Sequence, residues 1–273
     1  MNVRNYKKAL AGSLILMQMT TFSLPALGAT GLQNFTCKQT GVRAVFADVK
    51  EGQWYRDVVN SCYEMGLMVG RSANRFDPQG EVTLAEAICF AARIHSTYND
   101  AAVEADVAEG TGKWYDGAVA YAIKHGLIEK GAFADLDRPA TRAELAAIIA
   151  KALPDDQWQK VREVKSLPDV TVNSPYYNEI LKLYQAGVLT GNDDYGTFKC
   201  GTGITRAEAA AILNRVVIID NRCRLPLKEF APIMKKYECP FETANPAPAE
   251  PVNPAPAEPA PVDPVPVDQT PTK

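Results

Sequence analysis

Two arginines stand where a helix would ordinarily avoid a cation. The segments Thr141-Arg142-Ala143-Glu144 and Thr205-Arg206-Ala207-Glu208 each lead into an apolar run. This places Arg142 and Arg206 in the first turn of a helix, where the positive end of the helix dipole disfavours a cation by roughly a few tenths of a kcal/mol. A helix N-terminus also attracts anions, and a guanidinium adds a planar fork that fits a carboxylate. A solvated surface charge would also tolerate this position, so the residues alone offer two readings of Arg142 and Arg206: a solvated cation, or part of an anion site beside the helix start.

The residues around these arginines have a structural explanation. Thr-x-x-Glu before an apolar run is a capping box, in which each side chain satisfies a backbone N–H at the helix start. A third copy, Thr83-Leu84-Ala85-Glu86, has leucine in place of arginine. We assign helix capping to Thr83, Glu86, Thr141, Glu144, Thr205 and Glu208.

The boxes belong to a longer repeat, because other residues recur in the same order around each of them. An aspartate comes first, then a pair of residues that ends in tyrosine, then a glycine, and a basic residue follows seven positions after each box glutamate. The aspartates are Asp48, Asp106 and Asp169; the pairs are Trp54-Tyr55, Trp114-Tyr115 and Pro175-Tyr176; the glycines are Gly66, Gly126 and Gly187; the basic residues are Arg93, Lys151 and Arg215. We expect repeats at 45–98, 103–153 and 166–220.

Each repeat is predicted to fold as helix, loop, helix. Apolar residues recur at helical spacing before each glycine, and a glycine suits the left-handed residue that ends a helix. The second helices are expected at about 86–97, 144–153 and 207–219. A single helix pair cannot bury its own apolar face, so we predict a mainly all-α fold in which three repeats share one central helical bundle with pseudo-threefold symmetry.

The remaining segments differ in composition. Residues 1–28 have the basic start, apolar middle and small-residue end of a secretory signal peptide, and 29–44 form a lead. Residues 221–243 are expected to hold a short helix between 225 and 237. Between residues 245 and 271, ten of 27 residues are proline, so 244–273 is predicted to be a disordered, extended tail without a membrane span.

Composition and charge exclude several functions. Cleavage after residue 28 would leave 26 basic and 32 acidic residues, a net charge of −6, and no basic stripe indicates nucleic-acid binding. The six cysteines have no CxxC spacing and there are two histidines, so we expect no metal and no cofactor. Six cysteines allow 15 pairings, and we expect a disulfide between Cys223 and Cys239.

Together, Phe-x-Asp-Val, Trp-Tyr, Gly-Leu-x-x-Gly, Phe-x-Pro and Thr-Arg-Ala-Glu resemble the S-layer homology (SLH) repeat, in three copies over roughly residues 45 to 220. The resemblance implies a pseudo-trimer that binds secondary cell wall polysaccharide non-covalently, often through its pyruvylated sugars, in grooves between repeats. It further implies a secreted protein of the cell wall or S-layer, associated with the peptidoglycan wall, with no catalytic residues.

The resemblance assigns ligand contacts residue by residue. Arg142 and Arg206 match the family's binding arginine. Trp54 and Trp114 would stack on sugar rings, although core packing explains them equally well. The tyrosines would bind sugar hydroxyls: Tyr55, Tyr115 and Tyr176. The family's aspartate corresponds to Asp48, Asp106 and Asp169, for which holding a loop in place is the better explanation.

Departures from the family pattern occur in all three repeats. Leu84 removes the arginine of the first box, Pro175 replaces a tryptophan, and Glu129-Lys130 replaces the second glycine position of repeat two. We expect two working grooves, which depend on the boxes of repeats two and three.

Two other functions compete with wall binding. Glycosidases use paired carboxylates, and Asp155-Asp156 or Asp193-Asp194 would be the candidates in a wall hydrolase, but adjacent acids in a turn are usually only solvated. An accessory structural role in a surface layer is the other alternative.

Overall fold

The computed structural model describes residues 31–37, 46–101 and 112–229. Within these ranges the regular structure is helical, and the only β-pairing is a few isolated bridges. This confirms the mainly all-α prediction. The expected signal peptide and Pro-rich tail lie outside the described residues. The α-helices are α1 (Arg56–Glu64), α2 (Leu84–Tyr98), α3 (Asp116–Lys124), α4 (Arg142–Ala150), α5 (Tyr177–Gln185) and α6 (Arg206–Val217), and the short 3-10 helices are η1 (Leu32–Asn34), η2 (Asp155–Gln157) and η3 (Ile219–Asn221).

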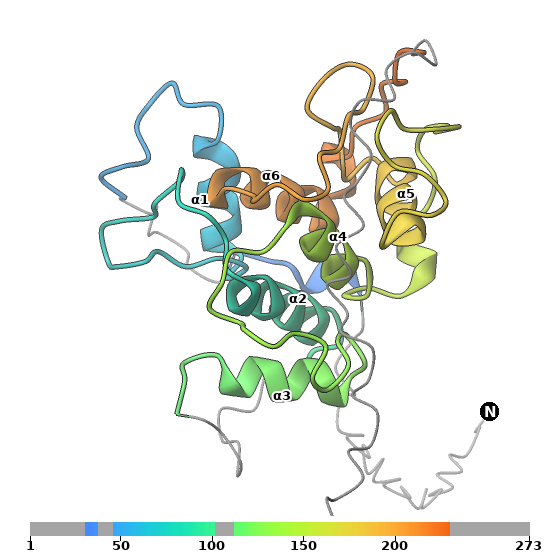
Figure 1. Cartoon of the computed structure of the whole chain (residues 1–273). Helices are drawn as coiled ribbons and strands as arrows, with labels where there is room; N and C mark the ends of the chain where they lie inside the picture. Colours follow the sequence, from blue (N-terminus) through green and yellow to red (C-terminus); the bar gives the residue numbers. More distant parts are fainter. Residues whose placement is uncertain (1–30, 38–45, 102–111, 230–273) are drawn as a thin grey trace, which may run out of the picture.

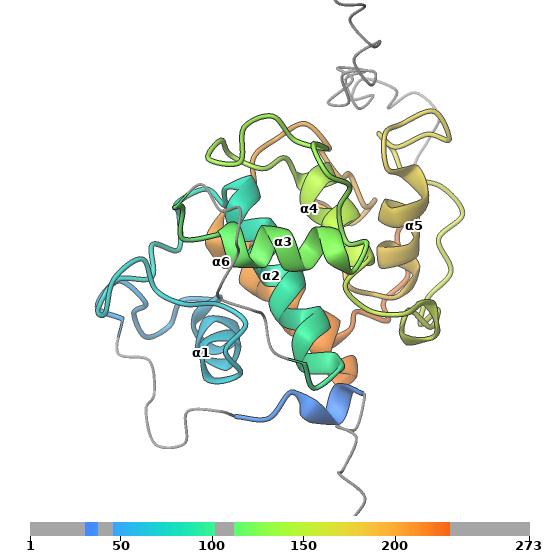
Figure 2. The ribbon, with the colours of Figure 1, turned by 90° about the horizontal axis from the view of Figure 1, so that it is seen from below.

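Helices α2, α4 and α6, the second helix of each expected repeat, form the core. Every residue of α4 is buried, as are most residues of α2 and α6. Their many alanines let the helix axes approach closely. Each first helix packs on the second helix of the preceding repeat, so that α3 lies against α2, α5 against α4, and α1 against α6 (Figures 1 and 2). The packing order is therefore cyclic.

Each inner helix begins with a complete capping box. The threonine hydroxyl accepts a hydrogen bond from the glutamate N–H at 3.2 Å for Thr83, 3.2 Å for Thr141 and 3.3 Å for Thr205. The glutamate carboxylate in turn accepts a bond from the threonine N–H at 3.0, 2.8 and 2.9 Å. One threonine-to-alanine change at such a cap costs about 1 kcal/mol.

The N–H groups between threonine and glutamate donate to loops of a neighbouring repeat. The first helical N–H bonds a loop carbonyl in all three cases: Leu84 to Arg138 at 3.0 Å, Arg142 to Thr202 at 2.9 Å, and Arg206 to Gly80 at 2.9 Å. The second does the same: Ala85 to Leu136, Ala143 to Cys200, and Ala207 to Pro78. The three segments before the helices also pair with one another, through bridges Glu81–Thr205, Thr83–Pro139 and Thr141–Gly203. The start of each inner helix is thus held by another repeat.

Gly187 shows why a glycine ends α5. Its φ of 71° lies in the left-handed region, and a Cβ there would approach the Cys223 carbonyl oxygen to 2.4 Å. The glycine therefore serves both the helix end and the chain that returns after α6. Arg222 holds this returning chain, because it donates to the carbonyls of Arg215 and Val216 at the end of α6 and to that of Gln157.

Two expectations are corrected here. Cys223 is a free thiol, whereas Cys200 is disulfide-bonded, so the predicted Cys223–Cys239 pairing was wrong; Cys239 itself lies outside the described residues. Residues 225–229, the described start of the expected C-terminal helix, are not helical. Spacing along the chain indicated an amphipathic stretch there, but this segment instead packs along the third repeat, where Leu227 lies against Gly196 and the Lys228 N–H donates to the Asp194 carbonyl.

Candidate functional site

Arg206 is buried in the first repeat. Its Nε donates to the Phe76 carbonyl at 2.9 Å, one terminal nitrogen donates to the Val69 carbonyl at 2.6 Å, and the other pairs with the Glu86 carboxylate at 2.5 Å. The guanidinium carbon lies 4.6 Å from the centre of the Phe76 ring. The arginine of the third box therefore joins the loop and the capping box of the first repeat.

Arg142, from the second repeat, makes the equivalent contacts in the third repeat. Its Nε donates to the Phe198 carbonyl at 2.8 Å, a terminal nitrogen pairs with the Glu208 carboxylate at 3.3 Å, and the Phe198 ring centre is 5.4 Å away. Both arginines predicted from the sequence thus contact the box glutamate of another repeat. Their binding of a ligand carboxylate stays a prediction.

Leu84 occupies the third such position and has no guanidinium. An arginine from the same repeat as the box glutamate pairs with that glutamate instead. Arg138 forms a two-pronged pair with Glu144, at 3.0 and 2.5 Å. Burial alone would raise the pKa of Glu144, but the bonds from Arg138 and Thr141 outweigh it and hold the pKa below its usual range. Every box glutamate therefore receives an arginine, and only the source of that arginine differs.

The backbone N–H groups at the starts of the inner helices are already hydrogen-bonded. The first three N–H groups of α2, α4 and α6 already have protein acceptors. The helix starts therefore do not offer free amides to an anion, and a ligand carboxylate would depend on guanidinium groups instead.

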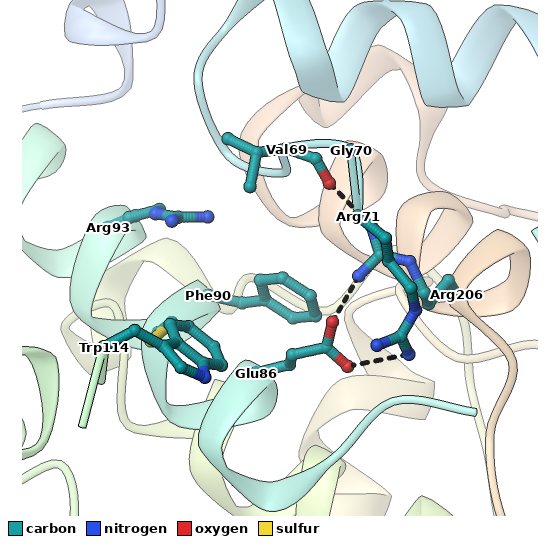
Figure 3. Close-up of a pocket in the computed structure, with 9 residues that line it drawn as sticks. Val69, Gly70, Arg71, Glu86, Phe90, Arg93, Trp114 and Arg206 are labelled. Atoms are coloured by element: carbon teal, nitrogen blue, oxygen red, sulfur yellow. Dashed lines mark hydrogen bonds and ion pairs between the residues drawn. The ribbon is translucent and has the colours of Figure 1, made fainter. Parts of the chain in front are cut away.

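A groove of about 410 Å³ is lined by α2, by the loop 69–71, by Trp114 just before α3 and by Arg206 at the start of α6, as Figure 3 shows. We call it the α2–α3 groove. Three of its lining residues are arginines from different parts of the chain, Arg71, Arg93 and Arg206, against a single carboxylate, Glu86. Phe90 and Trp114 provide apolar surface between them, together with Val69, Gly70 and Cys89. The groove therefore combines an excess of positive charge with an aromatic wall.

The three arginines differ in how many donors they have already used. Arg206 is engaged through all three nitrogens, and Arg71 bonds the Glu81 carbonyl, Asp77 and Glu86. Among the described residues, the Arg93 side chain makes one hydrogen bond, from a terminal nitrogen to the Leu67 carbonyl at 3.2 Å. Arg93 therefore keeps the most donors for a ligand. Arg93 occupies the repeating basic position, which the sequence alone did not link to a binding site, and Arg71 has no equivalent in the other repeats.

The two tryptophans do not belong to the core. Trp54 is 63% exposed and Trp114 is 66% exposed, which decides against core packing for both. Each stands edge-on against its neighbouring tyrosine, at 5.4 Å between ring centres. Those tyrosines, Tyr55 and Tyr115, are buried.

The aspartates brace the loops before the inner helices. Asp48 accepts hydrogen bonds from the N–H groups of Phe76 and Asp77, and Asp169 accepts the corresponding bonds from Phe198 and Lys199. Asp169 is 1% exposed. Both carboxylates thus hold the loop that carries the aromatic residue under a box arginine, and Asp106 lies outside the described residues.

A second, smaller groove of about 170 Å³ lies between α4 and α5; we call it the α4–α5 groove. Tyr176 lines it, with Lys151 and the carboxylates Glu129 and Glu179. The structure therefore places Tyr176 in a groove, whereas Tyr55 and Tyr115 are packed inside.

The acidic pairs considered for hydrolysis serve the local structure. Asp155 pairs with Lys182 and Asp194 with Lys228, while Asp193 accepts bonds from Tyr195 and Thr197 within its own turn. In the described ranges no cluster of three metal-ligating side chains occurs, and no helix there is long and apolar enough to cross a membrane.

Comparison with known proteins connects this geometry to a family. The model of the S-layer homology domain matches residues 45–88 and 166–210. The chain is 24% identical to the S-layer protein sap of Bacillus anthracis over 210 residues, and 28% identical to an S-layer protein of Bacillus thuringiensis subsp. finitimus over 125 residues. It is also 31% identical over 127 residues to the exoglucanase XynX of Acetivibrio thermocellus.

These alignments cover parts of each protein. They include 77%, 46% and 43% of this chain, but only 24%, 14% and 12% of the respective relatives. What is shared is therefore a module within much longer proteins. Within this chain, the S-layer homology domain is matched at 45–88 and 166–210, and each matched segment ends just after a capping box.

Proposed function

We propose that this chain is a cell-wall anchoring module that binds a pyruvylated secondary wall polysaccharide in the α2–α3 groove. One observation supports it above all: three arginines face a single carboxylate in a cavity of about 410 Å³ beside an exposed tryptophan. A pyruvylated sugar carries both a carboxylate and a C–H-rich ring face, so it complements both features.

Arg93 is the proposed principal contact for the carboxylate. Its remaining N–H donors suit a charge-assisted hydrogen bond, which is shorter and stronger than a neutral one. Arg71 and Arg206 add positive potential while staying bound to Glu86. Trp114 offers its exposed face to the sugar ring, and the groove walls lower the local dielectric, which strengthens the attraction between unlike charges.

The interface of α6 with α1 is the proposed second site. Arg142, Arg215 and Trp54 occupy there the repeat positions of Arg206, Arg93 and Trp114. Arg215 donates to the Val188 carbonyl at 3.4 Å, as Arg93 does to Leu67. The exposure of Trp54 supports the same aromatic role.

The wider setting belongs to the proposal as well. Two of the relatives are S-layer proteins, which supports a place at the cell surface for this chain. The predicted signal peptide would export it, and the predicted Pro-rich tail would act as an extended spacer. The exoglucanase relative shares only a small part of its length with this chain, so we propose binding and not catalysis as the role of the shared module.

The test is retention of the purified chain on isolated wall polysaccharide before and after mild acid removal of its pyruvyl groups. Arg93→Gln should weaken binding to the native polymer at least about tenfold, since one charge-assisted contact is worth about 1.5 to 3 kcal/mol. Arg75→Gln, at an exposed arginine outside the groove lining, is the matched control. Equal retention on pyruvylated and depyruvylated polymer would overturn the carboxylate assignment.

Substituting Arg142 and Arg206 would be a poor first test. Both guanidiniums hold the box glutamate of another repeat, so their loss would weaken the fold as well as the groove. Arg93 separates binding from folding more cleanly.

A further inference from the structure

The α4–α5 groove occupies the same place in its repeat pair as the α2–α3 groove. Ala147, Ile148 and Lys151 stand six, seven and ten residues after Thr141, as Cys89, Phe90 and Arg93 do after Thr83. Both sets line their groove. The two cavities are thus two versions of one site, and their differences are informative.

The charge of the lining is reversed. The α2–α3 groove has three arginines and one glutamate, whereas the charged residues of the α4–α5 groove are Glu129, Glu179 and Lys151. Glu129 stands where the other groove has Val69. The position that would supply a box arginine is Leu84, which is fully buried. Within the described residues, Glu129, Glu179 and Lys151 make no hydrogen bond or ion pair with another side chain, so all three remain available.

In the α4–α5 groove a different residue provides the aromatic surface. Pro175 replaces the exposed tryptophan of the other repeats, and Tyr176 lines the groove instead. Tyr176 has φ 57° and ψ 27°, a left-handed conformation, while its counterparts Tyr55 and Tyr115 have φ −89° and −100°. A non-glycine residue adopts such a backbone at a cost, and strain of this kind gathers at functional sites.

We propose that the α4–α5 groove is a second saccharide subsite that takes an uncharged sugar residue and rejects the pyruvylated one. This deepens the proposed function, because it assigns a different residue of the same class of polymer to a different groove. Carboxylates of Glu129 and Glu179 accept hydrogen bonds from sugar hydroxyls. The same two charges repel a ligand carboxylate, and Lys151 alone does not cancel them. Tyr176 supplies the ring on which the sugar lies.

The two grooves can be examined separately in one experiment. Two probes are needed: a methyl hexopyranoside, and the same glycoside carrying a pyruvyl ketal. Amide chemical shifts of the labelled full chain are followed by NMR as each probe is added. The parent glycoside should shift amides around Glu129 and Glu179, with an affinity about tenfold above that of the ketal at this groove. The ketal should shift amides around Arg71 and Arg93.

Each outcome bears on one proposal. If the ketal shifts the α4–α5 amides as strongly as the parent does, or if the parent leaves them unchanged, this inference is wrong. Absence of any shift around Arg71 and Arg93 with the ketal would count against the proposed function and leave the α4–α5 result to stand by itself.

Two isosteric substitutions test whether negative charge is what makes the α4–α5 groove reject the ketal. Glu129→Gln with Glu179→Gln removes the negative charge but keeps the shape, so the ketal should gain about tenfold in affinity at the α4–α5 groove, next to Lys151. Glu163→Gln, at an exposed glutamate outside both groove linings, is the matched control and should change nothing. An unchanged ketal affinity in the double variant would refute the charge argument.

Discussion

Arg206 and Glu86 are 120 residues apart in the chain and form a buried ion pair at 2.5 Å. Through this contact the box arginine of the third repeat completes the capping box of the first. The side chains are 3% and 11% exposed, so water screens the pair little. The pair therefore ties together the two ends of the repeat array.

Removing this arginine should destabilise the whole domain. Arg206→Met leaves the Glu86 charge buried with only Arg71 beside it, at 3.4 Å. Breaking one partner of a buried pair costs about 3 to 5 kcal/mol, and we expect a loss near the lower end because Arg71 remains. Urea unfolding monitored by circular dichroism measures it. Arg75→Gln, whose partner Asp77 lies in an exposed pair, should change stability by less than about 1 kcal/mol.

The stability of the folded protein in acid should depend on the Arg138–Glu144 pair. The folded pKa of Glu144 lies below its ordinary value, so its contribution to stability is complete above the unfolded pKa, about 4.3, and is lost as pH falls through the folded pKa. Arg138→Gln should raise the folded pKa and move this loss to higher pH. Unfolding free energies measured between pH 2 and 6 give the answer, and superimposable curves for both proteins would contradict it.

A histidine pair at the α2–α3 interface should cause a separate loss of stability nearer neutrality. His95 Nδ1 lies 2.9 Å from the Tyr121 hydroxyl, and His125 stacks on Tyr121 with ring centres 4.2 Å apart. Burial, and then the nearby His125, lowers the pKa of His95. The unfolded chain therefore takes up its proton first, and stability decreases as pH falls below about 6.5 toward the folded pKa.

The size of this effect is small because the His95 ring is only half-buried. We expect less than about 1 kcal/mol between pH 7.5 and 5. His95→Gln should flatten this part of the stability profile while leaving the Glu144 region unchanged. A slope that persists in the variant would mean that another group titrates.

Reactivity should distinguish three classes of cysteine: buried thiols, an exposed thiol and a disulfide. Burial raises the pKa of the Cys89 thiol to about 11 and raises that of Cys62 further, so neither should react with an aromatic disulfide reagent at pH 8 until the chain unfolds. Cys37, which is exposed, should react at once.

Cys200→Ser should abolish the disulfide and lower the free energy of unfolding by about 2 to 5 kcal/mol, whereas Cys223→Ser should retain the disulfide. Peptide mapping distinguishes the two variants.

Local features of this fold could be predicted from the sequence. The boxes at Thr83, Thr141 and Thr205 determine where the inner helices begin, because capping involves residues only three apart. The observed starts at Leu84, Arg142 and Arg206 come directly after the box threonines, one or two residues before the expected starts. Helical spacing likewise predicted an outer helix just before each of Gly66, Gly126 and Gly187, where α1, α3 and α5 end. The helix pairs therefore depend on short-range chemistry.

The partners of the box arginines could not be predicted in this way. Arg142 reaches Phe198 and Glu208, which depends on how the repeats are arranged around the axis and not on local spacing. The same holds for Arg138, which substitutes for an arginine missing from another repeat, and for the left-handed backbone of Tyr176. The repeating position of Arg93 was visible, but its place in the groove required the structure.

The bridges Glu81–Thr205, Thr83–Pro139 and Thr141–Gly203 have a consequence for how such modules evolve. Each pre-helix segment already uses both of its neighbours, so the assembly has no open edge onto which a fourth copy could be added. Open solenoids grow by duplication of a unit at one end. A module of this design can diversify only by substitution within its existing copies, as Leu84 and Pro175 illustrate, or by duplication of the entire trio.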